Sequence, residues 1–297
     1  MISVLNVSKS FEGTQALDEL TMTVPKGAIY GLVGPNGSGK STVIRHICGV
    51  YRPDSGKILV DGIPVYENAA VKSRMFVIPD DGYYFMQASV RDMMHFYKDI
   101  YPSFDTARFE KLRDVFKLDE KRPIRKMSKG MQKQAAFWLA ICLKPEILIL
   151  DEPVDGLDPV MRRQVWGLLM SDVAERETTV LVASHNLREL EDVCDHVGIL
   201  SKGRVLIERS LTELQEGIKK LQFVPGESGQ LPEGLEILHH SAAGRMHTLI
   251  VRGSSEDILS RAAAAGPVYS EEIPLTLEEI FIYELGGADY AVKDIIL

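Results

Sequence analysis

The stretch GPNGSGKS at residues 34–41 constrains this chain more than any other feature, because it matches the pattern G-x-x-x-x-G-K-[ST] at every fixed position. An apolar run of strand length, 28–33, precedes it, and residues 41–48 follow with apolar side chains at helical spacing. A glycine-rich loop between a strand and a helix can point successive backbone N–H groups at phosphate oxygens, near the positive end of the helix dipole. The stretch therefore predicts a nucleoside triphosphate site.

Within this loop, each polar residue has an expected task. Lys40 would reach the β- and γ-phosphates, and Ser41 would ligate Mg²⁺. The backbone and side chains around them supply the remaining candidate nucleotide contacts: Gly34, Asn36, Gly37, Ser38, Gly39 and Thr42. The alternative is a glycine-rich turn that fits the pattern by coincidence, and it would have to imitate the strand-to-helix context as well.

An acidic pair follows the aliphatic run at 147–150. A continuously apolar strand is typical of a parallel sheet buried on both faces, and open α/β sheets bind ligands at the carboxyl ends of their strands. We interpret the pair as a Walker B motif, in which Asp151 would hold Mg²⁺ through water and Glu152 would orient and deprotonate the attacking water. The alternative is that both are surface acids that cap the next helix.

Two further candidates lie near predicted strands. His185 follows the apolar strand 178–183, at the sheet edge that also carries the glycine-rich loop, and we expect it to contact the γ-phosphate. Phe11 lies between two early strands, 2–7 and 20–24, which predict a small antiparallel sheet. Its ring could stack on adenine or belong to the core.

The rest of the chain predicts two further parts. Residues 83–143 read as a helical, aromatic and Met-rich segment, in which Ser128 stands where the N-cap of a helix belongs. The acidic excess falls in residues 212–297, which hold 14 acidic and 6 basic side chains and predict a separate small α+β domain. Its expected strands and helices are 221–224, 234–238, 248–251, 254–265 and 276–284.

Charge and hydropathy limit the partners. The net charge of −8 argues against a chain whose main ligand is nucleic acid. The sequence shows neither a secretory leader nor 18 consecutive apolar residues. We therefore expect a cytoplasmic protein that depends on the helices of other subunits for any work at a membrane.

The order of these motifs resembles the ATP-binding subunits of ABC transporters over residues 1 to about 210. The resemblance implies a P-loop NTPase core of the α/β class at 1–211, with an antiparallel β subdomain and a helical subdomain at about 83–143. It implies that ATP is hydrolysed to ADP and phosphate to power export by separate integral membrane permease subunits, with the chain held at the inner face of the cell membrane through them. The alternative is a soluble ATPase of the same family that acts as a nucleotide-dependent switch on nucleic acid or the ribosome.

The same resemblance assigns further residues. It implies that Phe11 stacks on adenine, that Ser128 and Gly130 belong to the signature loop, and that His185 is the switch histidine. It places a D-loop at 155–158, with Asp158 near the nucleotide. In this family two ATPase subunits, identical or different, sandwich two ATP molecules, and each P-loop is completed by the signature loop of the partner.

Two departures refine the resemblance. The signature loop reads Met-Ser-Lys-Gly-Met, so that Lys129 and Met131 replace the usual glycine and glutamine. Asp80 stands where the family usually carries a glutamine that ligates Mg²⁺ and senses the membrane partner, and a carboxylate can also bind the ion. The alternative for Asp80 is an ordinary acidic residue of a turn. These features resemble the bacterial ABC-2 exporter branch, in particular its YtrB-like subunits.

The aromatic stretch after Asp80 predicts a docking surface for the permease. Tyr83, Tyr84 and Phe85 follow the point where the family docks a short cytoplasmic helix of the membrane subunit. Methionine-rich surfaces suit such a partner because the flexible thioether repacks easily. The alternative is that these aromatics close the core of the helical subdomain.

Overall fold

The computed structural model describes residues 1–226 and 230–285, and the chain forms two compact units. The first unit comprises residues 1–185 and 193–208, and the second comprises 186–192 together with 209–297, of which 227–229 and 286–297 lie outside the described residues. The longer part of the second unit starts at residue 209, whereas the sequence predicts a domain boundary after residue 211. Its inclusion of 186–192, directly after His185, is a feature that the sequence did not indicate.

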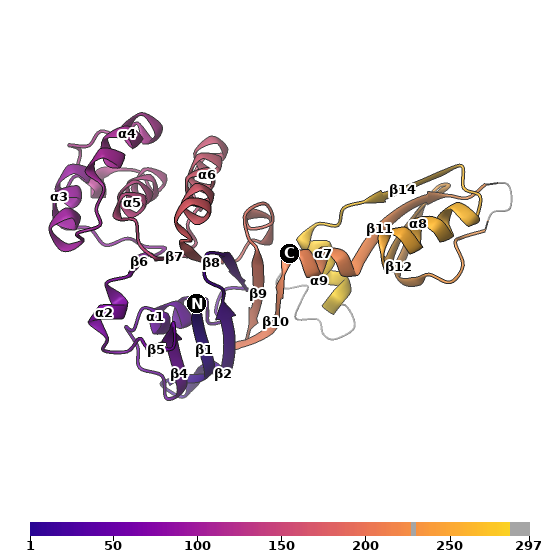
Figure 1. Ribbon diagram of the computed structural model, residues 1–297, viewed down its shortest axis with the longest axis horizontal. Coiled ribbons are helices and arrows are strands. Elements are labelled where there is room, and N and C mark those ends of the chain that lie inside the picture. The colour runs from indigo at the N-terminus through magenta and orange to yellow at the C-terminus, as the bar shows by residue number, and fades with distance from the viewer. Residues whose placement is uncertain (227–229, 286–297) are drawn as a thin grey trace. The chain divides into compact units, whose positions relative to one another are not determined.

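A six-stranded sheet forms the centre of the first unit, in the order β10-β9-β3-β8-β7-β6 (Figure 1). Its strands are β3 (Ile29–Val33), β6 (Met75–Ile78), β7 (Ile147–Asp151), β8 (Thr179–Ser184), β9 (His196–Ser201) and β10 (Arg204–Ser210). Every residue of β3, β7 and β8 is buried, and these strands pair in parallel. Their continuous apolar runs are what burial on both faces requires, and their carboxyl ends share one edge.

A second, antiparallel sheet covers part of this core, in the order β2-β1-β4-β5. It consists of β1 (Ile2–Phe11), β2 (Thr14–Val24), β4 (Ser55–Val60) and β5 (Ile63–Pro64). Inward residues such as Val4 and Met22 share one hydrophobic cluster with Leu32 of β3 and with Ile47, the last residue of helix α1 (Lys40–Ile47). The antiparallel sheet, the parallel sheet and α1 therefore fold around one core, as predicted for the α/β class.

The helices α3 (Val90–Ile100), α4 (Thr106–Phe116) and α5 (Lys129–Leu143) form the helical subdomain (Figure 1). Helices α3 and α4 both pack on α5, and the ring of Trp138 in α5 stacks on Phe109 of α4 with centroids 4.4 Å apart. Helix α3 begins later than expected, because Ser89 and Asp92 form a capping box there, and residues 83–89 precede it without helical structure. The remaining helices of this unit are α2 (Ala69–Lys72) and α6 (Pro159–Arg176), with a 3-10 turn at Ile124–Lys126.

The second unit is an α+β fold. Its antiparallel sheet has the order β12-β13-β11-β14 and consists of β11 (Ile218–Val224), β12 (Glu236–Ala243), β13 (Met246–Arg252) and β14 (Tyr269–Ile273). Helix α8 (Ser255–Ala264) packs Ile258 and Ala262 against this sheet, and α7 (Leu211–Gly217) and α9 (Leu277–Leu285) complete the unit. Arg188, in the 3-10 turn Leu187–Glu189, pairs with Glu278 of α9 at 2.9 Å.

None of the helices in residues 1–226 and 230–285 combines the length and the apolar character that a bilayer crossing requires.

Candidate active site

The glycine-rich loop joins β3 to α1 as predicted, and its geometry explains the glycine before the lysine. Gly39 has φ of 113°, and a Cβ there would lie 2.8 Å from the carbonyl oxygen of Ala16. No side chain caps α1, so no side-chain oxygen competes with a bound anion for the backbone N–H groups of its first turn. A helix terminus of this kind can bind an anion such as phosphate.

Lys40 lies inside the loop and is 6% exposed. Its Nζ donates to the carbonyl oxygens of Gly34 at 2.6 Å and Pro35 at 3.3 Å, and it lies 3.7 Å from Oε1 of Glu152. Burial lowers the pKa of the Lys40 ammonium, and the neighbouring carboxylates of Glu152 and Asp151 oppose that shift. An added phosphate would supply the negative charge that this buried cation favours.

Asp151 ends β7 and is 7% exposed, and burial raises the pKa of its carboxyl, although a hydrogen bond from Ser41 acts in the opposite direction. Its Oδ1 is buried and has no hydrogen-bond partner among the described residues. Buried polar atoms are rarely left unpaired, and oxygen ligands suit Mg²⁺. The Asp151 carboxylate and the Ser41 hydroxyl therefore fit a magnesium ion.

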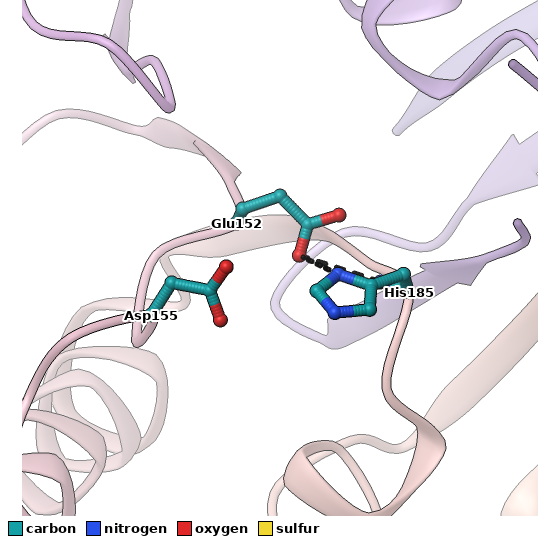
Figure 2. A group of neighbouring side chains, drawn as sticks. All are labelled: Glu152, Asp155 and His185. Atoms are coloured by element: carbon teal, nitrogen blue, oxygen red, sulfur yellow. Dashed lines mark hydrogen bonds and ion pairs between the residues drawn. The ribbon is translucent and has the colours of Figure 1, made fainter. Parts of the chain in front are cut away.

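Glu152 follows Asp151, and its carboxylate points toward the ring of His185 (Figure 2). Its Oε2 lies 2.9 Å from Nδ1 of His185 and also accepts from the His185 backbone N–H at 3.3 Å. Together with Asp155, these residues bring ligand atoms within 4.8 Å of one another. Glu152 has φ of 46°, in the left-handed region that costs a non-glycine residue conformational energy. Such backbone conformations persist where surrounding contacts hold them.

A cavity of about 300 Å³ brings most of the predicted site together. It is lined by residues from the loop and α1, from the end of β7 and from the loop after β6: Asn36, Gly37, Gly39, Lys40, Ser41, Thr42, Asp80, Asp151 and Glu152. Thr14, Gln15 and Ala16 of β2 also line it and were not predicted. Gly34 and Ser38 lie outside the lining, although both belong to the loop.

Phe11 lies at the end of β1, where it pairs with Thr14, one of the residues that line the cavity. Its ring is 37% exposed and lies 5.3 Å from the ring of Tyr51. The Lys9 ammonium lies 5.5 Å from the Phe11 centroid. Phe11 is therefore neither a core residue nor part of the cavity wall, and its stacking on adenine stays a prediction.

Ser128 and Asp158, both predicted near the nucleotide, are N-caps. Ser128 accepts from the N–H of Met131 at the start of α5, and Asp158 accepts from the N–H groups of Val160 and Met161 at the start of α6. Neither residue lines the cavity. Gly130 packs closely on the carbonyl of Gly156, and a Cβ at Gly130 would lie 2.3 Å from that oxygen.

Lys133 is a site residue that the sequence analysis missed. It is 8% exposed, its Nζ donates to the main-chain carbonyl of Glu152, and it pairs with Oδ1 of Asp80 at 3.2 Å. A signal for it existed, because position 133 shares a helix face with buried Phe137 and Ala140, and a lysine on such a face needs a partner.

A second cavity, of about 640 Å³, borders the helical subdomain. Tyr83 and Tyr84 line it together with Asp80 and Lys133. Tyr84 is 6% exposed and donates to the carbonyl of Gln132 at 3.3 Å, whereas Tyr83 is 78% exposed. Phe85 is 49% exposed but does not line the cavity. Of the three aromatic residues, Tyr84 is therefore a core residue, whereas Tyr83 and Phe85 lie on the surface.

Comparisons with known proteins indicate the family of this chain. The family model of the ABC transporter matches residues 17–155. The chain is 32% identical over 290 residues to the ABC transporter ATP-binding protein YtrB of Bacillus subtilis, covering 97% of this chain and 99% of that protein. It is 30% identical to the bacitracin transport ATP-binding protein BcrA of Bacillus licheniformis, over 75% of this chain and 74% of that protein.

A relative named for export also matches, as does a solved structure. The Nod factor export ATP-binding protein I of Sinorhizobium fredii is 33% identical over 77% of this chain and 69% of that protein. A solved ATP-binding subunit of an ABC transporter superposes with a TM-score of 0.67 at 26% identity, covering 72% of this chain and 92% of that chain. These matches confirm the expected family and fold, and they favour a transport subunit over the alternative that acts on nucleic acid.

Proposed function

This chain belongs to the ATP-binding subunits of ABC transporters and is an ATPase, and we propose that it powers export through separate integral membrane subunits. The observation that carries the mechanism is the position of Glu152, whose carboxylate lies 3.7 Å from Lys40 and 2.9 Å from His185. That placement lets a carboxylate at the carboxyl end of β7 act on a water beside a phosphate held by the loop.

Each residue has a proposed task in hydrolysis. Lys40 binds the β- and γ-phosphates, Glu152 accepts the proton of the attacking water, and His185 holds the Glu152 carboxylate and contacts the γ-phosphate. Ser41 and Asp151 would hold Mg²⁺, with Asp80 as a further candidate contact, and the ion would neutralise charge on the phosphates. Because phosphoryl transfer needs little covalent help from the protein, positioning and electrostatics account for most of the rate.

A second ATPase subunit, the same chain or a related one, completes the site. Ser128 and Gly130 lie at the N-terminus of α5 and outside the cavity of their own chain, which supports a contact with the γ-phosphate held by the partner. The Asp158 loop would lie at the same interface. Hydrolysis would then depend on dimerisation.

The membrane partner is proposed to dock on Tyr83, which lines the larger cavity, and on its sequence neighbours Phe85 and Met86. Tyr83, Phe85 and Met86 are exposed by 78%, 49% and 80%, which gives an adaptable apolar surface beside Asp80. An amphipathic helix of a permease fits such a surface. The chain would thereby lie on the cytoplasmic face of the membrane, and nucleic acid is not among the proposed partners.

Copurification tests the transport assignment. The tagged chain, recovered from detergent-solubilised membranes of the cells that produce it, should copurify with integral membrane proteins, and its ATPase activity should need Mg²⁺. Recovery of active protein with ribosomes or nucleic acid, and without permease, would contradict the proposal.

A further inference from the structure

Lys133 connects three parts of the first unit that are far apart in the sequence. It belongs to α5 of the helical subdomain, it bonds the main-chain carbonyl of Glu152 after β7, and it pairs with Asp80 after β6 at 3.2 Å. Its side chain is 10% exposed, whereas that of Asp80 is 57% exposed. A buried ammonium whose partners follow two different strands is a costly arrangement, which an apolar side chain of similar size often replaces without loss of stability.

The contact with Glu152 acts on the backbone rather than on the carboxylate. The Glu152 N–H donates to the carbonyl of Ala183 on β8 at 2.9 Å, and its own carbonyl accepts from Lys133. Hydrogen bonds from two different elements thus fix the two sides of a residue with φ of 46°. That conformation directs the Glu152 carboxylate toward Lys40 and His185, as Figure 2 shows for His185.

The contact with Asp80 lies between the two cavities. Asp80 lines both the nucleotide cavity and the larger cavity beside the helical subdomain, and Lys133 lines the larger one. A change at the larger cavity that moves Asp80 therefore alters one of the two interactions that Lys133 makes. The other interaction is the one that holds Glu152.

We propose that Lys133 is a positioning residue for hydrolysis. Its ammonium holds the backbone of Glu152 in the orientation that directs the carboxylate toward Lys40 and His185. Its ion pair with Asp80 connects that orientation to the larger cavity. The inference rests on the proposed role of Glu152 as the base. A purely structural lysine would contribute to folding without acting through Glu152.

A mutant cycle separates these roles. Lys133→Met should lower kcat by about 10- to 100-fold, the range that loss of one hydrogen bond to a charged group covers. The KM for ATP and the affinity for a fluorescent ATP analogue should change by less than about threefold, because the phosphate-binding loop is untouched. In the Glu152→Gln background, the same substitution should cause no further loss of the residual hydrolysis, measured with radiolabelled ATP.

Two further variants keep the test decisive. Gln134→Met, at the next and half-buried position of α5, should retain wild-type kcat and controls for an apolar change in this helix. If Lys133→Met does not fold, Lys133→Gln replaces it in the cycle; an amide keeps a donor for the carbonyl, so the expected loss of kcat is smaller, about 3- to 10-fold. This loss too should vanish in the Glu152→Gln background.

The outcomes distinguish this inference from the proposed function. Wild-type kcat in the Lys133 variant, or losses that multiply in the double variant, would overturn the positioning role while leaving Glu152 as the base. Near wild-type hydrolysis by Glu152→Gln alone would overturn the proposed base. Loss of nucleotide affinity in Lys133→Met, parallel to its loss of kcat, would assign the residue to the nucleotide site or to folding.

Discussion

Gly130→Ala tests the proposed signature loop through a contact that the structure measures. A Cβ at Gly130 would lie 2.3 Å from the carbonyl oxygen of Gly156, whereas real Cβ contacts are at least 3.0 Å. Because the atom on the other side is backbone, the start of α5 and the loop at 155–158 must move apart. Overpacking of this kind costs about 1–3 kcal/mol of folding free energy. The melting temperature of a domain of this size should therefore fall by roughly 2–12 °C.

The same displacement should impair hydrolysis more than binding. A shift of about 1 Å in a group that contacts the transition state costs roughly 100-fold in rate. ATP affinity of the isolated subunit should remain within about threefold, because the phosphate-binding loop belongs to other elements. Differential scanning calorimetry, steady-state hydrolysis and equilibrium ATP binding measure the three quantities.

Gly167→Ala is the matched control for this substitution. Gly167 is an exposed residue of α6, and nothing lies within 4 Å of a Cβ added there. Alanine should stabilise that helix by about 0.5–1 kcal/mol and leave hydrolysis unchanged. Wild-type stability in Gly130→Ala would refute the close contact with Gly156. Lost stability with unchanged hydrolysis would refute the role of Gly130 in catalysis.

Three further predictions concern adenine, magnesium and docking. Phe11→Ala should raise the KM for ATP about 2- to 10-fold, which corresponds to the free energy of one aromatic stacking contact. An unchanged KM would exclude stacking of Phe11 on adenine. Asp80→Ala should raise the Mg²⁺ concentration needed for half-maximal hydrolysis while Mg²⁺-free nucleotide binding persists; an identical Mg²⁺ titration would make Asp80 an ordinary residue of a turn. Tyr83→Glu, at an exposed position, should abolish permease copurification without a change in melting temperature, whereas Tyr84→Glu should destabilise the protein because it buries a charge. Equal copurification by the Tyr83 variant would refute the docking surface.

The parts of the fold that follow from local patterns were predictable from the sequence. The aliphatic run 147–150 becomes β7, and the motif with Lys40 joins β3 to α1, because a buried parallel strand and a phosphate-binding loop impose strict residue types. Helix α6 also carries a local signal, with buried Met161, Val165 and Leu169 at helical spacing, although it was not predicted.

Long-range contacts account for what the sequence could not indicate. Lys133 and Asp80 are 53 positions apart, and only the fold shows that a lysine among apolar residues meets that carboxylate. Residues 186–192 join the second unit through contacts such as Arg188 with Glu278, 90 positions away. The contact of the Phe11 ring with Tyr51 is likewise one that the pattern of its own strand does not indicate.

Hydrolysis and ATP binding by Glu152→Gln test the central claim most directly. The amide keeps the size of the side chain and leaves the main-chain bond from Lys133 in place, but it cannot accept the proton of the attacking water. Turnover should fall by about 100- to 10,000-fold, the usual cost of removing a general base. ATP should still bind, and size-exclusion chromatography with ATP should show a stable dimer. Turnover within a few-fold of the unmodified chain would contradict the account.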